Sequence, residues 1–132
     1  MDYFDIQLSE DALREVSALG LAYVGDCVYE LLVRSHLLLR GRQTNRSLHA
    51  AAVELSRAPA QAAAAARLLP RLTEEELAVF RRGRNSHVNS VPRHAELGDY
   101  HAATGLECLF GWLYLSGRRE RVNELFQWIV EN

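Results

Sequence analysis

Two acidic residues interrupt the two most apolar stretches of this sequence. Asp26 lies within residues 21–31, and Glu107 lies within residues 103–115. Burying an unpaired carboxylate costs a large part of a small domain's whole stability margin, so each acid needs a compensating partner. Two carboxylates brought together from two helices would form a hard-oxygen site suited to a divalent cation. An arginine partner or partial exposure to solvent would also satisfy the acids, and this alternative stays open.

Small residues accompany both acids at helical spacing. Gly111 follows Glu107 by one helical turn, and Ala22 precedes Asp26 by one turn. A glycine inside a helix costs about 1 kcal/mol relative to alanine, so Gly111 predicts that something approaches its helix closely. A crossing helix, a metal shell and a ligand would each explain the pattern.

Composition limits the range of functions. A chain of 132 residues corresponds to about one domain, which we expect to span residues 1–132. The net charge of −2 is close to neutral, so any binding of nucleic acid must come from a local patch. Neither a signal-peptide pattern nor a membrane span is evident, and we expect a cytoplasmic protein. Cys27 and Cys108 are too few for a zinc site and are expected to be small buried residues in a reducing compartment.

The spacing of apolar residues is helical almost throughout, and no alternating strand pattern of useful length occurs. The sequence therefore predicts an all-α fold of about six to seven helices. Their expected spans are Ser9 to about Leu19, about Leu21 to Arg40, Thr44 or Asn45 to about Ser56, an alanine-rich segment that stops before Pro70, Thr73 to about Arg84, Asp99 to Gly117, and Glu120 to Glu131. Residues 84–98 are rich in turn formers and are expected to form a long functional loop.

Residues 81–93 form the one strongly basic segment, and no acid follows until Glu96. Arginine side chains match phosphate oxygens bidentately, and neutral amides and hydroxyls add contacts to sugar and phosphate. No aromatic residue lies in the segment, which favours a duplex backbone over stacking on unpaired bases. Arginines at a helix carboxyl end also interact favourably with the helix dipole, so a purely structural role stays open. The candidate contacts are Arg81, Arg82, Arg84, Asn85, His87 and Arg93.

Residues 23–30 and 104–115 resemble the two acidic signature helices of the ribonuclease III endonuclease domain. The Arg-Gly-Arg-Asn element at residues 82–85 is similar to that of Mini-ribonuclease III, the compact branch without a double-stranded-RNA-binding domain. The resemblance extends from about Leu19 to Leu125.

This resemblance implies the ribonuclease III fold, a twofold dimer and a magnesium-dependent endoribonuclease, in which manganese can substitute for magnesium. It implies that the substrate is double-stranded RNA and, in this branch, precursor large-subunit (23S) ribosomal RNA, with a ribosomal protein or the pre-ribosome as a further partner. Asp26 and Glu107 match the acids that serve as catalytic metal ligands in the family.

Three positions depart from related patterns. Ala22 and Thr104 stand where full-length ribonuclease III has further acids, although the compact branch is similar at both places. The metal site would therefore be sparse, with water filling the remaining positions. His87 stands where the compact branch tends to have a lysine, which predicts weaker or more pH-sensitive binding of RNA.

The helix around Asp26 is the expected dimer interface, because it offers more apolar surface than one small core can absorb. The residues expected in the interface are Leu19, Leu21, Val24, Val28 and Leu31.

Two functions of other classes remain as alternatives. The first is an RNA-binding or ribosome-binding module of this fold with a decayed site, since a surviving acid pair does not prove turnover. The second is an all-α metal-dependent nucleotide pyrophosphatase. That class requires several acids at helical spacing on each helix, whereas this chain has one on each, apart from Glu30 one turn after Asp26.

Overall fold

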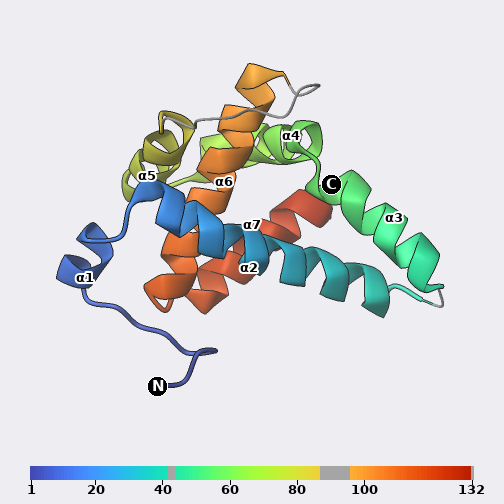
Figure 1. Ribbon diagram of the computed structural model, residues 1–132, viewed down its shortest axis with the longest axis horizontal. Coiled ribbons are helices and arrows are strands. Elements are labelled where there is room, and N and C mark those ends of the chain that lie inside the picture. Colours follow the sequence, from blue (N-terminus) through green and yellow to red (C-terminus); the bar gives the residue numbers. More distant parts are fainter. Residues whose placement is uncertain (42–43, 87–95, 132) are drawn as a thin grey trace.

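A computed structural model describes residues 1–41, 44–86 and 96–131 of the protein (Figure 1). The regular structure in these residues is entirely helical, which confirms the all-α prediction. The helices are α1 (Glu10–Arg14), α2 (Ala18–Leu39), α3 (Asn45–Ser56), α4 (Ala58–Leu68), a 3₁₀ turn at Leu69–Arg71, α5 (Glu74–Arg84), α6 (Leu97–Leu115) and α7 (Arg119–Val130).

The first helix is shorter than the sequence predicted. Ser9 caps α1 by accepting a hydrogen bond from the amide of Ala12, but the helix ends at Arg14 instead of about Leu19. Ser17 provides the reason, because its side chain accepts a 2.9 Å hydrogen bond from the amide of Gly20 and begins α2 there. Serine satisfies amides that a helix leaves unpaired at its start, so a second cap ends the continuity of the first helix.

The expected cap of α6 is also wrong. Asp99 lies inside the first turn, and Glu96 is the residue that precedes the helix, without a capping side-chain bond. Asp99 still carries its charge at the positive end of the helix dipole, where an acid is favourable. At the other end Gly117 has a φ of +77°, and the amides of Gly117 and Arg118 bond to the carbonyls of Tyr114 and Leu113. This is the glycine-dependent helix ending that the sequence predicted.

Helix α6 is the central element of the fold (Figure 1). It packs against α2, α4, α5 and α7, and α2 crosses it most extensively. Its buried residues come from every side of the helix, and they include Leu106, Leu109 and Phe110. A helix that is apolar all round is stable only when neighbours cover it on every side, which is the arrangement found here.

Backbone contact between α2 and α6 occurs at two glycines. A Cβ atom on Gly25 would lie 1.6 Å from the backbone oxygen of Glu107, and one on Gly111 would lie 1.9 Å from the backbone oxygen of Leu21. No side chain fits at either position, so the helices approach at the closest distance that glycine allows. The close approach that Gly111 predicted is therefore made by a crossing helix.

Helix α5 also packs closely against α6, and Gly83 is its point of contact with Gly105 and Cys108. A Cβ atom on Gly83 would lie 2.5 Å from the Cβ atom of Cys108 and 3.0 Å from the Cα atom of Gly105. The glycine of the Arg-Gly-Arg-Asn element thus allows α5 and α6 to pack closely. As a result, the basic end of α5 lies beside the turn of α6 that carries Glu107.

A buried ion pair joins α5 to α7. The guanidinium of Arg121 donates two hydrogen bonds of 2.8 Å to the carboxylate of Glu76, whose side chain also completes the capping box with Thr73. Burial raises the pKa of Glu76, but the hydrogen bonds from Arg121 and Thr73 outweigh it and hold the pKa below its usual value. This bidentate pair fixes the start of α5 against the last helix.

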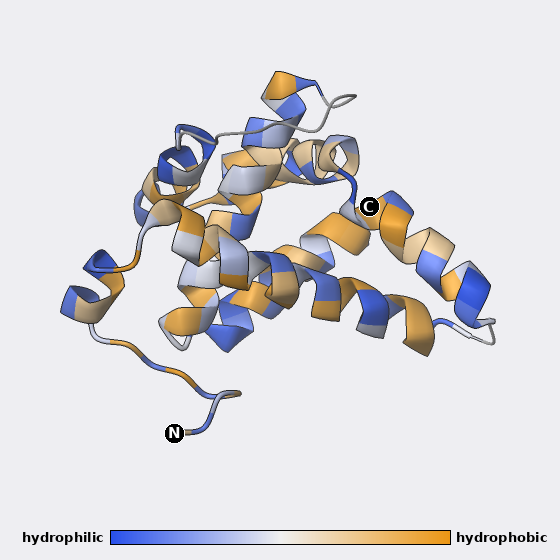
Figure 2. Cartoon of the chain, in the orientation of Figure 1, coloured by the Kyte–Doolittle hydropathy of each residue, from blue (hydrophilic) through white to orange (hydrophobic). Residues whose placement is uncertain are grey.

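Helix α2 carries apolar side chains at its far end, where the last turn is coloured as hydrophobic in Figure 2. Leu38 and Leu39 are 62% and 84% exposed there. None of the helices in the described segments is both long enough and apolar enough to cross a membrane.

Candidate active site

The crossing of α2 and α6 brings the two predicted acids together. Asp26 follows Gly25 on α2, and Gly25 contacts the backbone of Glu107 on α6. The side chain of Asp26 lies within interaction range of Glu107, and a hydrogen bond between the two carboxyl groups is one cause of the raised pKa of Glu107. The juxtaposition that the sequence predicted is therefore present, and it is produced by contact between the helix backbones.

The two acids differ in exposure. Glu107 is half-buried, whereas Asp26 is exposed, so the expectation of two buried acids is wrong for Asp26. The buried face of α2 carries Leu21, Gly25 and Tyr29, and Asp26 lies one residue beyond it. Burial, the adjacent charge of Asp26 and their shared hydrogen bond raise the pKa of Glu107 to about 8. A nearby cation would stabilise the charged form of such a carboxyl, so cation binding would release its proton.

Cys27 also lies on the outer side of α2. It is exposed, so the prediction of a buried cysteine is wrong there, whereas Cys108 on α6 is fully buried as predicted. Burial raises the pKa of the Cys108 thiol to about 11, which keeps it a neutral packing residue at neutral pH.

A polar side chain from α4 reaches the acid pair. The amide nitrogen of Gln61 donates to Glu107 Oε2 at 3.3 Å and to the backbone oxygen of Ser56 at 2.8 Å. Gln61 was not among the residues predicted from the sequence. The available signal was its position as the one polar side chain within residues 58–66, which are otherwise alanine and proline.

A second acid on α2 is already satisfied. Glu30 accepts a 2.8 Å hydrogen bond from the Nε atom of Arg34 and another of 2.8 Å from the hydroxyl of Ser56. Burial raises the pKa of Glu30, but these bonds outweigh it and lower the pKa overall. Glu30 therefore lies in an ion pair one turn from Asp26, and among the described residues no group of three or more His, Cys, Asp or Glu could hold a metal.

The residues of the pair fit a hard divalent cation. Two carboxylates from different helices face each other, and neither has an arginine or lysine ion-pair partner within the described structure. The amide of Gln61, whose nitrogen bonds to Glu107, has a buried carbonyl oxygen without a hydrogen-bond donor among the described residues. Carboxylate and amide oxygens are the ligands and acceptors that magnesium and its waters prefer.

The predicted phosphate contacts lie at the end of α5. Arg81, Arg84 and Asn85 are exposed there, and the Nε atom of Arg84 donates to the side chain of Asn85. Arg82 is also exposed, but its guanidinium donates a 2.8 Å hydrogen bond to the backbone oxygen of Val16, between α1 and α2. Arg82 thus also has a structural role, because it joins α5 to the segment between α1 and α2. His87 and Arg93 lie outside the described residues.

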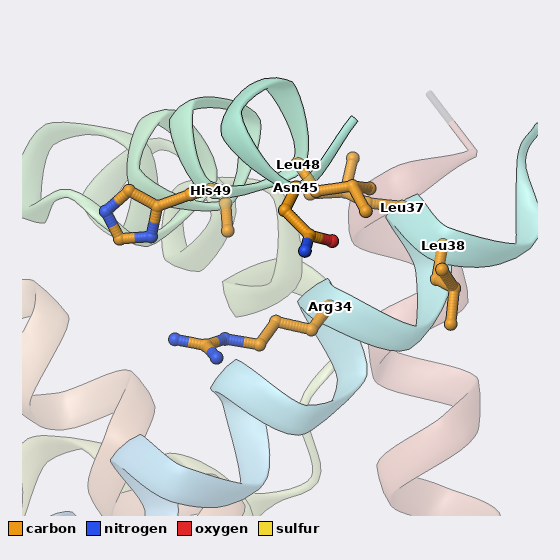
Figure 3. A pocket seen from close by; sticks show the side chains of 7 residues that line it. Arg34, Leu37, Leu38, Asn45, Leu48 and His49 are labelled. Atoms are coloured by element: carbon orange, nitrogen blue, oxygen red, sulfur yellow. The ribbon is translucent and has the colours of Figure 1, made fainter. Parts of the chain in front are cut away.

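A groove of about 310 Å³ lies elsewhere, between the far half of α2 and α3 (Figure 3). Neither acid lines it. Three leucines and an alanine line it together with three polar side chains, and the guanidinium of Arg34 is the group bonded to Glu30. The lining residues are Arg34, Leu37, Leu38, Asn45, Leu48, His49 and Ala52.

Comparison with known proteins identifies the class to which this fold and acid pair belong. The Ribonuclease III domain family matches residues 19–118, and the chain belongs to the ribonuclease III family of endoribonucleases. Among its relatives, the Mini-ribonuclease 3 of Symbiobacterium thermophilum is 47% identical over 109 residues, covering 83% of this chain and 84% of that protein. The Mini-ribonuclease 3 of Brevibacillus brevis is 45% identical over 109 residues, covering 83% of this chain and 81% of that protein.

A solved structure shares the fold. The crystal structure of a protein from Fusobacterium nucleatum superposes with a TM-score of 0.84 at 27% sequence identity, covering 93% of this chain and 98% of that one. These matches confirm the resemblance on which the sequence-based assignment to the compact branch depended.

Proposed function

We propose that this chain is a magnesium-dependent endoribonuclease that cuts double-stranded RNA as a twofold dimer. The observation that carries the proposal is the pairing of Asp26 and Glu107 at the α2–α6 crossing, together with the raised pKa of Glu107. For the natural substrate we propose precursor large-subunit (23S) ribosomal RNA, in the cytoplasm. This part is supported by the resemblance of residues 23–30, 82–85 and 104–115 to the compact branch.

The acids and the arginines would have different roles in this reaction. Asp26 and Glu107 would hold a magnesium ion, and manganese would be accepted by the same oxygen ligands. When bound, this ion supplies Lewis-acid activation of a water and stabilises charge on the scissile phosphate. Asp26 is the exposed member of the pair, so it faces the side from which a phosphodiester can arrive. The exposed arginines of α5 would hold the duplex backbone, which is recognised by shape and charge.

Cleavage of a perfect RNA duplex, with and without magnesium, tests this proposal. We expect both strands to be cut only when the divalent ion is present. Duplex binding without cleavage would support instead the RNA-binding module that the sequence left open. Hydrolysis of nucleoside triphosphates without RNA cleavage would indicate the pyrophosphatase, against which the family match already argues.

The dimer is proposed on the outer face of α2. Leu19, Tyr23 and Leu31 are 46%, 80% and 58% exposed, and with Cys27 they recur every four residues along one stripe. Leu21 is fully buried in the core, so its predicted place in the interface is wrong. The helix positions explain the difference, because Leu21 points toward α6 beside Gly111 while the stripe points away from it.

Replacing Leu31 by Arg should convert the dimer to a monomer, because the new charge would be buried without a partner at the interface. Sedimentation at micromolar concentration should give twice the 14.9 kDa chain mass for the wild type and the single mass for the variant. Val53→Arg is the matched control, since Val53 is an exposed apolar residue on α3, outside the stripe. A wild-type monomer that cuts both strands would contradict the dimer.

Replacing both Arg81 and Arg84 by Ala should weaken duplex binding irrespective of RNA sequence. Each lost phosphate contact should flatten the plot of log affinity against log salt by about one unit. The control variant is Arg14→Ala/Arg57→Ala, which removes the same charge from two arginines that are paired with acids on α1 and α3. Equal salt slopes for the two double variants would show that the basic end of α5 does not hold RNA and serves the helix dipole.

A further inference from the structure

Gln61 occupies an unusual position for an alanine-rich helix. Its side chain is 3% exposed, and it extends from α4 to the acid on α6 that lies 46 residues away in the chain. A buried amide normally pairs both its nitrogen and its oxygen, because an unpaired polar atom forfeits its hydration. Here the nitrogen has two partners, while the oxygen has none among the described residues.

The surroundings fix which way the amide faces. Both partners of the nitrogen are oxygen acceptors: the last backbone carbonyl of α3, at Ser56, and the carboxylate of Glu107. A reversed amide would place its own oxygen against both of them, which is electrostatically unfavourable. The carbonyl oxygen of Gln61 is therefore directed away from these two acceptors, and no described residue donates a hydrogen bond to it.

We propose that Gln61 is a positioning residue for Glu107 in metal binding. The bond from its nitrogen holds Glu107 Oε2 toward α4, which leaves the other carboxylate oxygen for the cation shared with Asp26. Its unpaired carbonyl oxygen accepts a hydrogen bond from a water in the hydration shell that the cation brings. This inference rests on the proposed function. Gln61 then has two roles: it orients Glu107, and it accepts a hydrogen bond from that water.

A neutral amide suits this role better than a third acid. Another carboxylate at this position would place a third negative charge beside the pair formed by Asp26 and Glu107. The amide donates to Glu107 without adding charge, and Ser56 anchors it from the end of α3. Residues that orient a metal ligand in this way typically change metal affinity by about 10- to 100-fold when they are replaced.

The test measures manganese binding to the RNA-free protein by titration calorimetry. Gln61→Met keeps the length of the side chain but removes both polar atoms, and Gln61→Asn keeps the amide on a side chain shorter by one methylene. We expect each variant to bind manganese about tenfold more weakly than the wild type. In cleavage, each should need about tenfold more magnesium for half-maximal rate, with duplex affinity in calcium unchanged.

Leu68→Ala is the control for a purely structural role. Leu68 is fully buried on the same helix, two turns beyond Gln61, so its truncation should lower the melting temperature while the bond from Gln61 to Glu107 is kept. We expect wild-type manganese affinity in this variant. Wild-type manganese affinity in a folded Gln61→Met or Gln61→Asn protein would overturn the role of Gln61 and leave the proposed nuclease standing. A wild-type protein that binds manganese but cuts no duplex would overturn the nuclease and leave the role of Gln61.

Discussion

Replacing Glu107 by Gln should lower the rate of duplex cleavage at least about a thousandfold. A bound metal stabilises the transition state by several kcal/mol, and each 1.36 kcal/mol that is lost slows the reaction about tenfold. Asp26→Asn should have the same effect, since the amide keeps the shape of the side chain but removes the charge that attracts a cation. Single-turnover cleavage of a labelled duplex at fixed magnesium measures both variants. Near-normal rates in either would remove that residue from the metal site.

Stability measurements separate this loss of activity from a loss of fold. Burial and the charge of Asp26 raise the pKa of Glu107 from 4.5 to about 8. A carboxyl with a raised pKa in the folded state contributes stability that is complete below pH 4.5 and is lost as the pH rises through 8. In EDTA, the melting temperature of the wild type should therefore fall across this range more than that of Glu107→Gln. A Glu107→Gln protein that is less stable than the wild type at pH 8 would contradict this account.

Gly111→Ala should be strongly destabilising, although it adds only one methyl group to the molecule's interior. The added carbon would lie 1.9 Å from the backbone oxygen of Leu21, and backbone atoms cannot rotate aside as a flexible side chain can. The helices would have to separate, so we expect a loss of more than about 3 kcal/mol of unfolding free energy or failure to fold. Denaturation in urea measures the change, and Gly25→Ala should behave in the same way.

Gly98→Ala is the matched control for this prediction. It makes the same substitution in the same helix, α6, at a position where a Cβ atom would meet nothing within 4 Å. Alanine favours helices over glycine by up to about 1 kcal/mol, so this variant should be as stable as the wild type or slightly more stable. A Gly111→Ala protein that unfolds within about 1 kcal/mol of the wild type would show that the crossing tolerates separation.

Local signals in the sequence predicted most of the fold. Thr44 and the capping box at Thr73 begin their helices as predicted, and Gly41 and Gly117 follow the ends of theirs, because these residues act on amides and carbonyls a few positions away. Ser17 was missed as a cap because the apolar spacing continues across it. The end of a helix is therefore predictable where one cap residue marks it and the apolar pattern stops at the same place.

The orientation of α2 could not be predicted in the same way. Residues 21–33 are apolar on nearly every face, so periodicity does not distinguish Leu21, which is buried, from Tyr23 and Cys27, which are exposed. The contact of Arg82 with Val16 and that of Gln61 with Glu107 span 66 and 46 residues of sequence. Contacts of that range depend on how the helices cross, which no local pattern specifies. The acid pair was predicted because an acid inside an apolar helix requires a partner wherever that partner lies.

The glycine crossing has a thermodynamic consequence. Because backbone contact at Gly25 and Gly111 brings Asp26 and Glu107 together, we expect the proposed cation site to form together with the packed core, in one cooperative transition. A divalent ion that binds only the folded chain then stabilises the entire domain by mass action, in proportion to the logarithm of its concentration above its dissociation constant. The melting temperature of the whole protein would then report how far the proposed site is occupied, in an experiment that needs neither RNA nor turnover.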